Sequence, residues 1–160
     1  MPPIPTLSLI TVLLSGCAGV NSGDPWGAWV LYQSEQCPDP DIPAGITWIG
    51  DAETFATFYA KSRRLHPALP RNPALDFTRQ GAVVVRMGSQ PTTGYNLTLL
   101  GTELGDETLL IRVEQQSPLP GTRTKRAVTA PCLVLGLPRV PQVVVEDMTG
   151  QKLGTITPGQ

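Results

Sequence analysis

The feature that most constrains the fold is a pair of short apolar segments separated by a stiff polar loop. Residues 82–87 are rich in β-branched side chains, and residues 95–99 alternate between apolar and polar, which is typical of strands. In the first segment Val84 and Arg86 share one face, and the other valines with Met87 form the opposite face. Both segments are therefore predicted to be β-strands.

The loop between these strands contains residues that restrict the backbone. Pro91 fixes its own φ angle and biases Gln90 toward an extended conformation. Gly94 can take the positive φ that lets a chain reverse direction. We therefore predict a rigid loop that closes the two strands into a hairpin.

The rest of the chain repeats this kind of element, with one exception. Short apolar or alternating runs predict further strands at residues 26–33, 46–49, 108–114, 132–137, 143–148 and 153–156. The exception is a helix, predicted from the spacing of Phe55, Phe58 and Tyr59 after Asp51 as a candidate N-cap. The pattern predicts a mainly β fold, either an antiparallel β-sandwich or an open barrel of about seven short strands with one covering helix. It leaves the strand order open.

Length and charge limit the class of protein. A chain of 160 residues that is 41% hydrophobic suits one compact domain with its own core, which we place at residues 26–160. A formal net charge of −1 gives no basic face of the kind that binds nucleic acid. We therefore expect no nucleic acid partner.

The N-terminal segment has the features of an export signal. The apolar run at residues 7–14 is shorter than the roughly 20 residues that a membrane-spanning helix needs, and it fits the apolar region of a signal peptide. Leu14-Ser15-Gly16-Cys17 resembles the bacterial lipobox, which predicts a signal peptide at residues 1–16 and lipidation of Cys17. Residues 1–6 contain no Lys or Arg, so an ordinary secreted protein or a wrongly assigned start is the alternative.

Lipidation would place the protein at the cell envelope. No aspartate follows Cys17 directly, a pattern that resembles outer-membrane sorting in lipoproteins of Gram-negative bacteria. We expect a lipid-anchored protein on the periplasmic face of the outer membrane, with residues 17–25 as a flexible tether.

The cysteines predict one disulfide. If Cys17 is lipidated, Cys37 and Cys132 remain as an even number in an oxidising compartment, and we predict that they pair. The closed loop would be long and would constrain the unfolded chain by about 4–5 kcal/mol. Two buried free thiols are the alternative.

The sequence contains no recognisable catalytic set. His66 is the single histidine, and without a second histidine or a carboxylate pair no hydrolase constellation can form. Neither Cys37 nor Cys132 has a neighbouring histidine to activate it. The glycines do not open a helix that could hold phosphate, and the acidic residues lack the spacing of a calcium loop. We expect a protein that is not an enzyme and that needs no cofactor or metal.

Two motifs resemble a known family. Residues 88–95 are similar to the glycine-proline-(Thr/Ser)-x-Gly-Tyr signature of the protease complex subunit PrcB family. Residues 129–138 resemble its second landmark, a proline followed by a strand and a Leu-Pro pair. The resemblance covers roughly residues 81–148 and implies an accessory subunit of an extracellular protease complex.

We expect the first loop to carry the partner contact, because a loop that is already ordered loses less entropy on binding. Its binding residues would be Gly88, Gln90, Pro91, Thr92, Thr93, Gly94 and Tyr95. The basic tip of a second loop, Arg123, Lys125 and Arg126, would lie beside it and face an acidic partner. The alternative for this tip is ordinary solvation.

Two other functions stay open. Residues 91–95 also resemble the inhibitory loop of chagasin-like cysteine protease inhibitors, but that family uses two further loops. Pro120-Gly121 and residues 137–139 match those loops poorly. The second alternative is a structural envelope lipoprotein in which the loop is only a turn, because Pro and Gly are common in turns for structural reasons.

Overall fold

The computed structural model describes residues 27–71 and 73–159. In chain order its elements are β1 (Trp29–Ser34), β2 (Gly45–Ile49), α1 (Ala52–Leu65), β3 (Gln80–Arg86), β4 (Asn96–Leu104), β5 (Thr108–Gln116), β6 (Cys132–Pro138), β7 (Gln142–Asp147) and β8 (Lys152–Ile156). The predicted signal peptide, the predicted lipidation site at Cys17 and the predicted tether lie outside the described residues.

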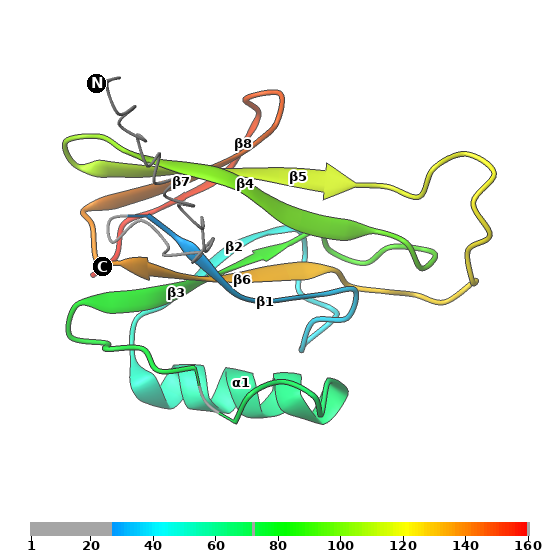
Figure 1. The fold of residues 1–160 in the computed structure, drawn as a ribbon, viewed down its shortest axis with the longest axis horizontal. Coiled ribbons are helices and arrows are strands. Elements are labelled where there is room, and N and C mark those ends of the chain that lie inside the picture. Colours follow the sequence, from blue (N-terminus) through cyan, green and yellow to red (C-terminus); the bar gives the residue numbers. More distant parts are fainter. Residues whose placement is uncertain (1–26, 72, 160) are drawn as a thin grey trace, which may run out of the picture.

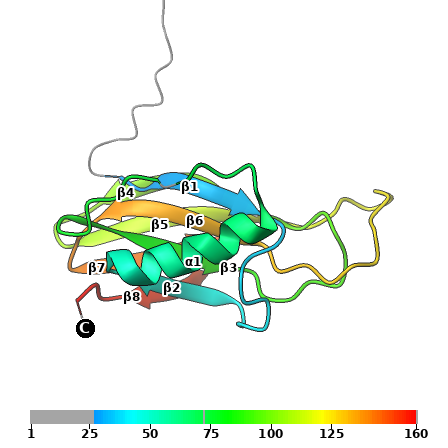
Figure 2. The same cartoon turned by 90° about the horizontal axis from the view of Figure 1, so that it is seen from below.

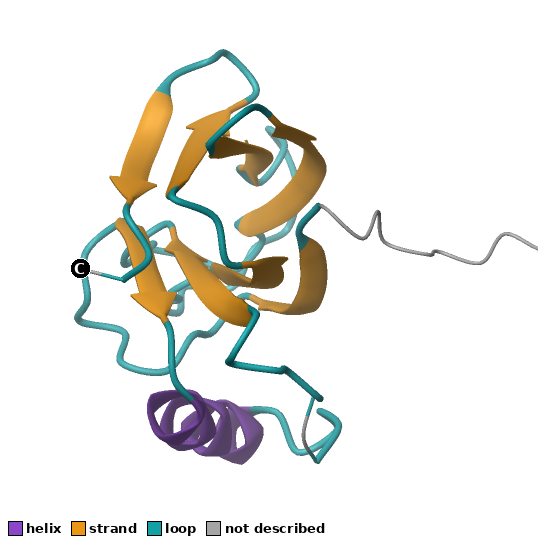
Figure 3. Ribbon diagram, turned by 90° about the vertical axis from the view of Figure 1, so that its left-hand side faces the viewer, coloured by secondary structure: helices purple, strands orange, loops and turns teal. Residues whose placement is uncertain are grey.

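The strands form two stacked sheets, and α1 covers the outer face of one of them (Figures 1 and 3). The strand orders are β1-β6-β3-β2 and β4-β5-β7-β8. This confirms the predicted sandwich with one helix. The described part has eight strands, because the last predicted segment also forms a strand, β8, which pairs with β7.

The predicted hairpin is wrong. The strands on either side of the loop, β3 and β4, belong to different sheets. β3 instead pairs with β2 on one side and β6 on the other. Its residues from Gly81 onward are all buried, so it is a central strand covered by the other sheet on one face and by α1 on the opposite face. The loop after it therefore crosses from one sheet to the other.

The sandwich is also not wholly antiparallel, because β5 and β7 pair in parallel. Between them the chain crosses to the other sheet and runs along it as β6. The chain then re-enters the second sheet at the end where β5 began. A parallel pair follows from this route, because parallel neighbours need a crossover connection.

Two apolar layers hold the fold together. Between the sheets, valine, leucine and isoleucine side chains from β3, β4, β5, β6 and β7 form the larger core. Between α1 and its sheet, Phe55, Phe58 and Tyr59 pack against Tyr32 and Val84. The carboxylate of Asp51 accepts a hydrogen bond from the Thr54 backbone N–H at 2.8 Å, which confirms the predicted N-cap.

The predicted disulfide between Cys37 and Cys132 is confirmed, with 5.5 Å between the Cα atoms. It joins the loop after β1 to the first residue of β6. The Cys37 backbone N–H also donates to the Ala130 carbonyl oxygen at 2.8 Å. Both cysteines are buried, so this bond fixes the loop that precedes β2 against the sheet.

Candidate functional site

Two loops extend together beyond one end of the sandwich (Figures 1 and 2). One is the crossing between β3 and β4, and the other is the long connection between β5 and β6. Gln90 and Thr129 exchange two backbone hydrogen bonds of 2.8 and 2.9 Å, and the Thr93 N–H donates to the Lys125 carbonyl at 3.1 Å. Sequence analysis predicted binding residues in both loops, and the structure places the two loops side by side.

The residues predicted in the first loop differ in exposure. Pro91 and Gly94 are exposed, Gly88 is buried, and Gln90, Thr92, Thr93 and Tyr95 are half-buried. Gly88 and Gly94 have positive φ angles of 72° and 95°, as Gly94 was predicted to have. Two polar groups are used within the protein: the Gln90 side-chain amide donates to the Met87 carbonyl at 3.0 Å, and the Thr93 hydroxyl oxygen accepts from the Lys125 N–H.

The second loop combines basic and apolar side chains on its exposed side. Arg123, Lys125 and Arg126 are all exposed. Leu119 and Val128 are 76% and 69% exposed, the largest fractions among the large hydrophobic residues of the described chain. We define the loop surface as Leu119, Arg123, Lys125, Arg126 and Val128 together with residues 88–95. A hollow of about 550 Å³ lies between the end of β5 and Gly94 at its base.

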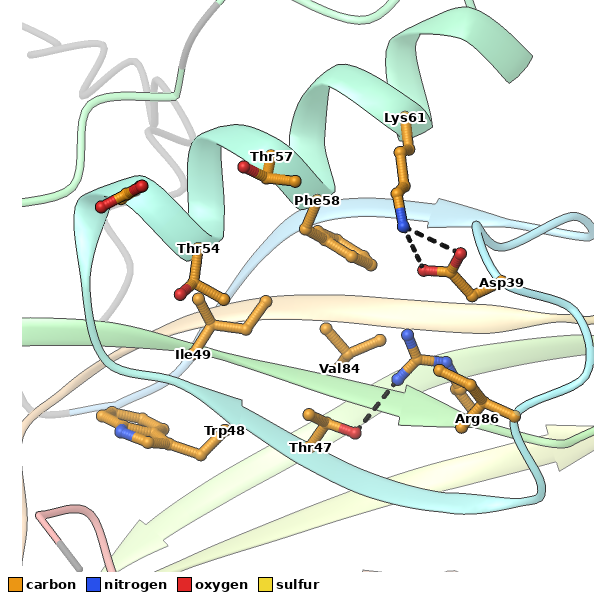
Figure 4. Close-up of a pocket in the computed structure, with 12 residues that line it drawn as sticks. Asp39, Thr47, Trp48, Ile49, Thr54, Thr57, Phe58, Lys61, Val84 and Arg86 are labelled. Carbon is orange, nitrogen blue, oxygen red and sulfur yellow. Dashed lines mark hydrogen bonds and ion pairs between the residues drawn. The ribbon is translucent and has the colours of Figure 1, made fainter.

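A second candidate site, which sequence reasoning missed, is a groove between α1 and β2 (Figure 4). Arg86, the last residue of β3, projects into it although only 7% of the residue is exposed. Its Nη1 donates to the Thr47 hydroxyl oxygen at 3.2 Å, and its guanidinium carbon lies 5.9 Å from the centre of the Phe58 ring. Burial lowers the pKa of Arg86 below its usual value. The signal in the sequence was one charged residue within an otherwise apolar strand.

The single histidine is not free at the surface. His66 Nε2 lies 2.7 Å from the Ser34 hydroxyl oxygen and 2.9 Å from the Gln36 carbonyl oxygen. A carbonyl oxygen can only accept, so the second contact favours a proton on Nε2. A protonated Nε2 cannot take the Ser34 proton, so this pair lacks the arrangement that activates a serine nucleophile.

Within residues 27–71 and 73–159, no three side chains of His, Cys, Asp or Glu lie close enough together to hold a metal ion. No helix in that part of the chain is both long and apolar enough to cross a bilayer.

Comparison with known proteins gives one family. Residues 82–138 match the family described as PrcB C-terminal. No curated protein and no solved structure matches the chain. The match begins in β3 and ends with β6, so it includes both loops of the loop surface. It confirms, over residues 82–138, the resemblance to the PrcB family seen in the sequence.

Proposed function

We propose that this chain is a non-catalytic, protein-binding accessory subunit of a protease complex, and that it contacts its partner through the loop surface. The PrcB C-terminal match supports the protease-associated role. The site follows from the chemistry of the two loops. Lipid on Cys17 would hold the protein at the cell envelope.

The observation that carries this proposal is the exposure of Leu119 and Val128. Both apolar side chains are largely exposed on one loop, at 76% and 69%, and basic residues lie between them in the sequence. A loop that exposes both apolar and basic side chains suits contact with another protein, because loops positioned by a rigid scaffold commonly carry binding residues. The basic side chains favour an acidic partner and would speed its association.

The two loops are already ordered against each other. Backbone hydrogen bonds at Gln90 and Thr93 tie the first loop to the second. The Thr129 hydroxyl also donates to the Thr92 carbonyl oxygen at 2.9 Å. A surface held in this way loses less conformational entropy on binding than a free loop does.

The position of β1 indicates where a lipid anchor at Cys17 would be joined to the domain. Ser34, at the end of β1, pairs with Cys132 close to the loop surface, whereas Trp29 pairs with Gly136 further along β6. The described chain therefore begins away from the loop surface. An anchor at Cys17 would then be joined to the domain at a distance from the loop surface, which leaves that surface accessible to a partner.

The chemistry of the described residues supports a non-catalytic role. The Ser34 and His66 contact lacks an activated nucleophile, as argued above. Cys37 and Cys132 are joined in a disulfide, so neither offers a free thiolate for covalent catalysis.

The proposal is tested by crosslinking the protein in the envelope and identifying the recovered partners by mass spectrometry. We expect the wild type to recover a protease subunit, and Leu119→Ser with Val128→Ser to lower recovery by about 10-fold or more, as expected when central apolar contacts are removed. Leu104→Ser is the matched control, because Leu104 is 43% exposed and lies in the β4–β5 hairpin at the opposite end.

Two results would contradict the proposal. Equal recovery of the protease by the loop variants and the wild type would show that the loop surface is not the contact. Recovery of partners without any protease subunit would remove the accessory role.

A further inference from the structure

We propose that the groove between α1 and β2 binds a carboxylate carried on an apolar group, with Arg86 as the residue that holds the anion. The groove has a volume of about 400 Å³. The ligand class we infer is a peptide whose C-terminal residue is apolar. This site does not rest on the proposed function, because its test uses purified protein and small probes.

Arg86 is a buried charge with few partners. One of its five N–H groups donates to Thr47, and its Nε is buried without a hydrogen-bond partner among the described residues. None of the ion pairs within the described chain includes Arg86. Buried N–H groups of a charged side chain that lack acceptors are unfavourable, so an anion that accepts from them would stabilise this arrangement.

The acidic groups of the groove do not supply that anion. Asp39 and Glu53 are the acidic residues that line it. Lys61 Nζ lies 3.0 Å from both carboxylate oxygens of Asp39 (Figure 4). The charge of Asp39 opposes the lowering of the Arg86 pKa by burial, but among the described residues Asp39 accepts no hydrogen bond from Arg86 and forms no ion pair with it. Glu53 is exposed in the first turn of α1, whereas Arg86 lies at the end of β3 nearest the loop surface. The remaining N–H groups of the Arg86 guanidinium are therefore available to a carboxylate from another molecule.

The lining of the groove selects an apolar carrier for the carboxylate. Its apolar side chains come from the helix, from both adjacent strands and from the loop before β2: Ile42, Ile49, Phe58 and Val84. Figure 4 shows Ile49, Phe58 and Val84 on the same side of the sheet as Arg86, facing α1. A planar guanidinium binds a carboxylate in a bidentate manner, and the apolar walls favour the group that carries it.

The experiment is an NMR titration of the whole purified chain, followed at the Arg86 Nε–H and the Ile49 methyl resonances. The probes are N-acetyl-phenylalanine, its neutral amide, inorganic phosphate, and N-acetyl-Ala-Ala-Phe. We expect both resonances to shift and saturate with the acetylated amino acid. We expect the amide to bind about 10-fold or more weakly, because it lacks the charge-assisted hydrogen bonds. The tripeptide should bind more tightly than the single amino acid if the ligand is a peptide.

Variants connect the shifts to the site. Arg86→Lys should weaken binding of the carboxylate probe by about 10-fold, because an ammonium group cannot form the two parallel bonds. Arg79→Lys is the matched control at an exposed arginine. If Arg86→Lys does not fold, Thr57→Trp should block the groove, because Thr57 is exposed on α1 and lines the groove.

Several outcomes would overturn the inference. These are no saturable shift in the wild type, equal affinity for the acid and the amide, or equal affinity for phosphate. Another is an Arg86 resonance that moves on Asp39→Asn and with none of the probes, which would make Asp39 the partner of Arg86.

Discussion

Thr93 and Lys125 hold the two loops of the loop surface together through two hydrogen bonds. The Lys125 backbone N–H donates to the Thr93 hydroxyl oxygen at 3.0 Å, and the Thr93 N–H donates to the Lys125 carbonyl at 3.1 Å. The residues are 32 positions apart in the chain. These two hydrogen bonds make the loops one ordered unit, although one loop joins β3 to β4 and the other joins β5 to β6.

Thr93→Val should loosen this unit. The change removes the side-chain acceptor of the Lys125 N–H and should lower the free energy of unfolding by about 1 kcal/mol, a typical value for one hydrogen bond. Hydrogen exchange at the Lys125 amide should become faster. Thr92→Val is the control, since Thr92 accepts from Thr129 through its carbonyl oxygen. Unchanged exchange at Lys125 in Thr93→Val would contradict the role given to this hydroxyl.

Removal of the disulfide should strongly destabilise the protein. Cys37 and Cys132 are separated by 95 positions, so the bond constrains the unfolded chain by about 4–5 kcal/mol on chain-entropy grounds. Replacement of both residues by alanine should lower the free energy of unfolding in urea by about this amount. Wild type in reductant should behave similarly. If the unfolded, unreduced protein gains mass on alkylation at these cysteines, the bond is absent in solution.

Stability should fall at alkaline pH because of Tyr32. Burial raises the pKa of its hydroxyl from 10.0 to about 12, and the oxygen lies 2.5 Å from the Ser62 hydroxyl. Because the folded-state pKa is the higher one, its contribution is complete below pH 10.0 and is lost as pH rises toward about 12. The full effect corresponds to about 3 kcal/mol.

The measurement for this prediction is urea unfolding as a function of pH. Tyr32→Phe should show a shallower decline than wild type above pH 10.0. Ultraviolet absorbance of tyrosinate would report the ionisation directly. Identical alkaline profiles for the variant and the wild type would assign the decline to other groups.

Gly88→Ala should destabilise the protein more than Gly121→Ala. Both glycines have positive φ angles, 72° and 83°, so alanine at either position should lower the free energy of unfolding by about 1 kcal/mol or more. A Cβ at Gly88 would also lie 2.9 Å from the Ala44 backbone nitrogen, whereas a Cβ at Gly121 has no neighbour within 4 Å. Denaturant unfolding of both variants tests this, and equal losses would show that the Ala44 contact relaxes without cost.

The hairpin prediction failed for a physical reason. The residues around Pro91 and Gly94 indicate that the chain turns, and it does. They do not indicate whether the next strand pairs with β3 or crosses to the other sheet. That choice depends on β2 and β6, which occupy both edges of β3. The parallel pairing of β5 and β7 was missed in the same way, because it depends on the path of β6.

The groove was missed because burial of a charge depends on distant residues. Alternation in the strand correctly placed Val84 and Arg86 on one face. It could not show that α1 covers that face, with Phe58 from the helix and Thr47 from β2 beside the guanidinium. The two loops of the loop surface, by contrast, were both identified from the sequence, although not the hydrogen bonds that join them.

The sequence by itself determined which segments are strands, where α1 begins at Asp51, and where the chain turns at Gly94. These properties depend on neighbours within a few positions, such as the Thr54 N–H that the Asp51 carboxylate caps. Only the tertiary structure decided which sheet each strand joins and that Arg86 is buried. Pairing and burial depend on contacts between residues far apart in the chain, and Thr47 and Arg86, which are 39 positions apart, are one such contact.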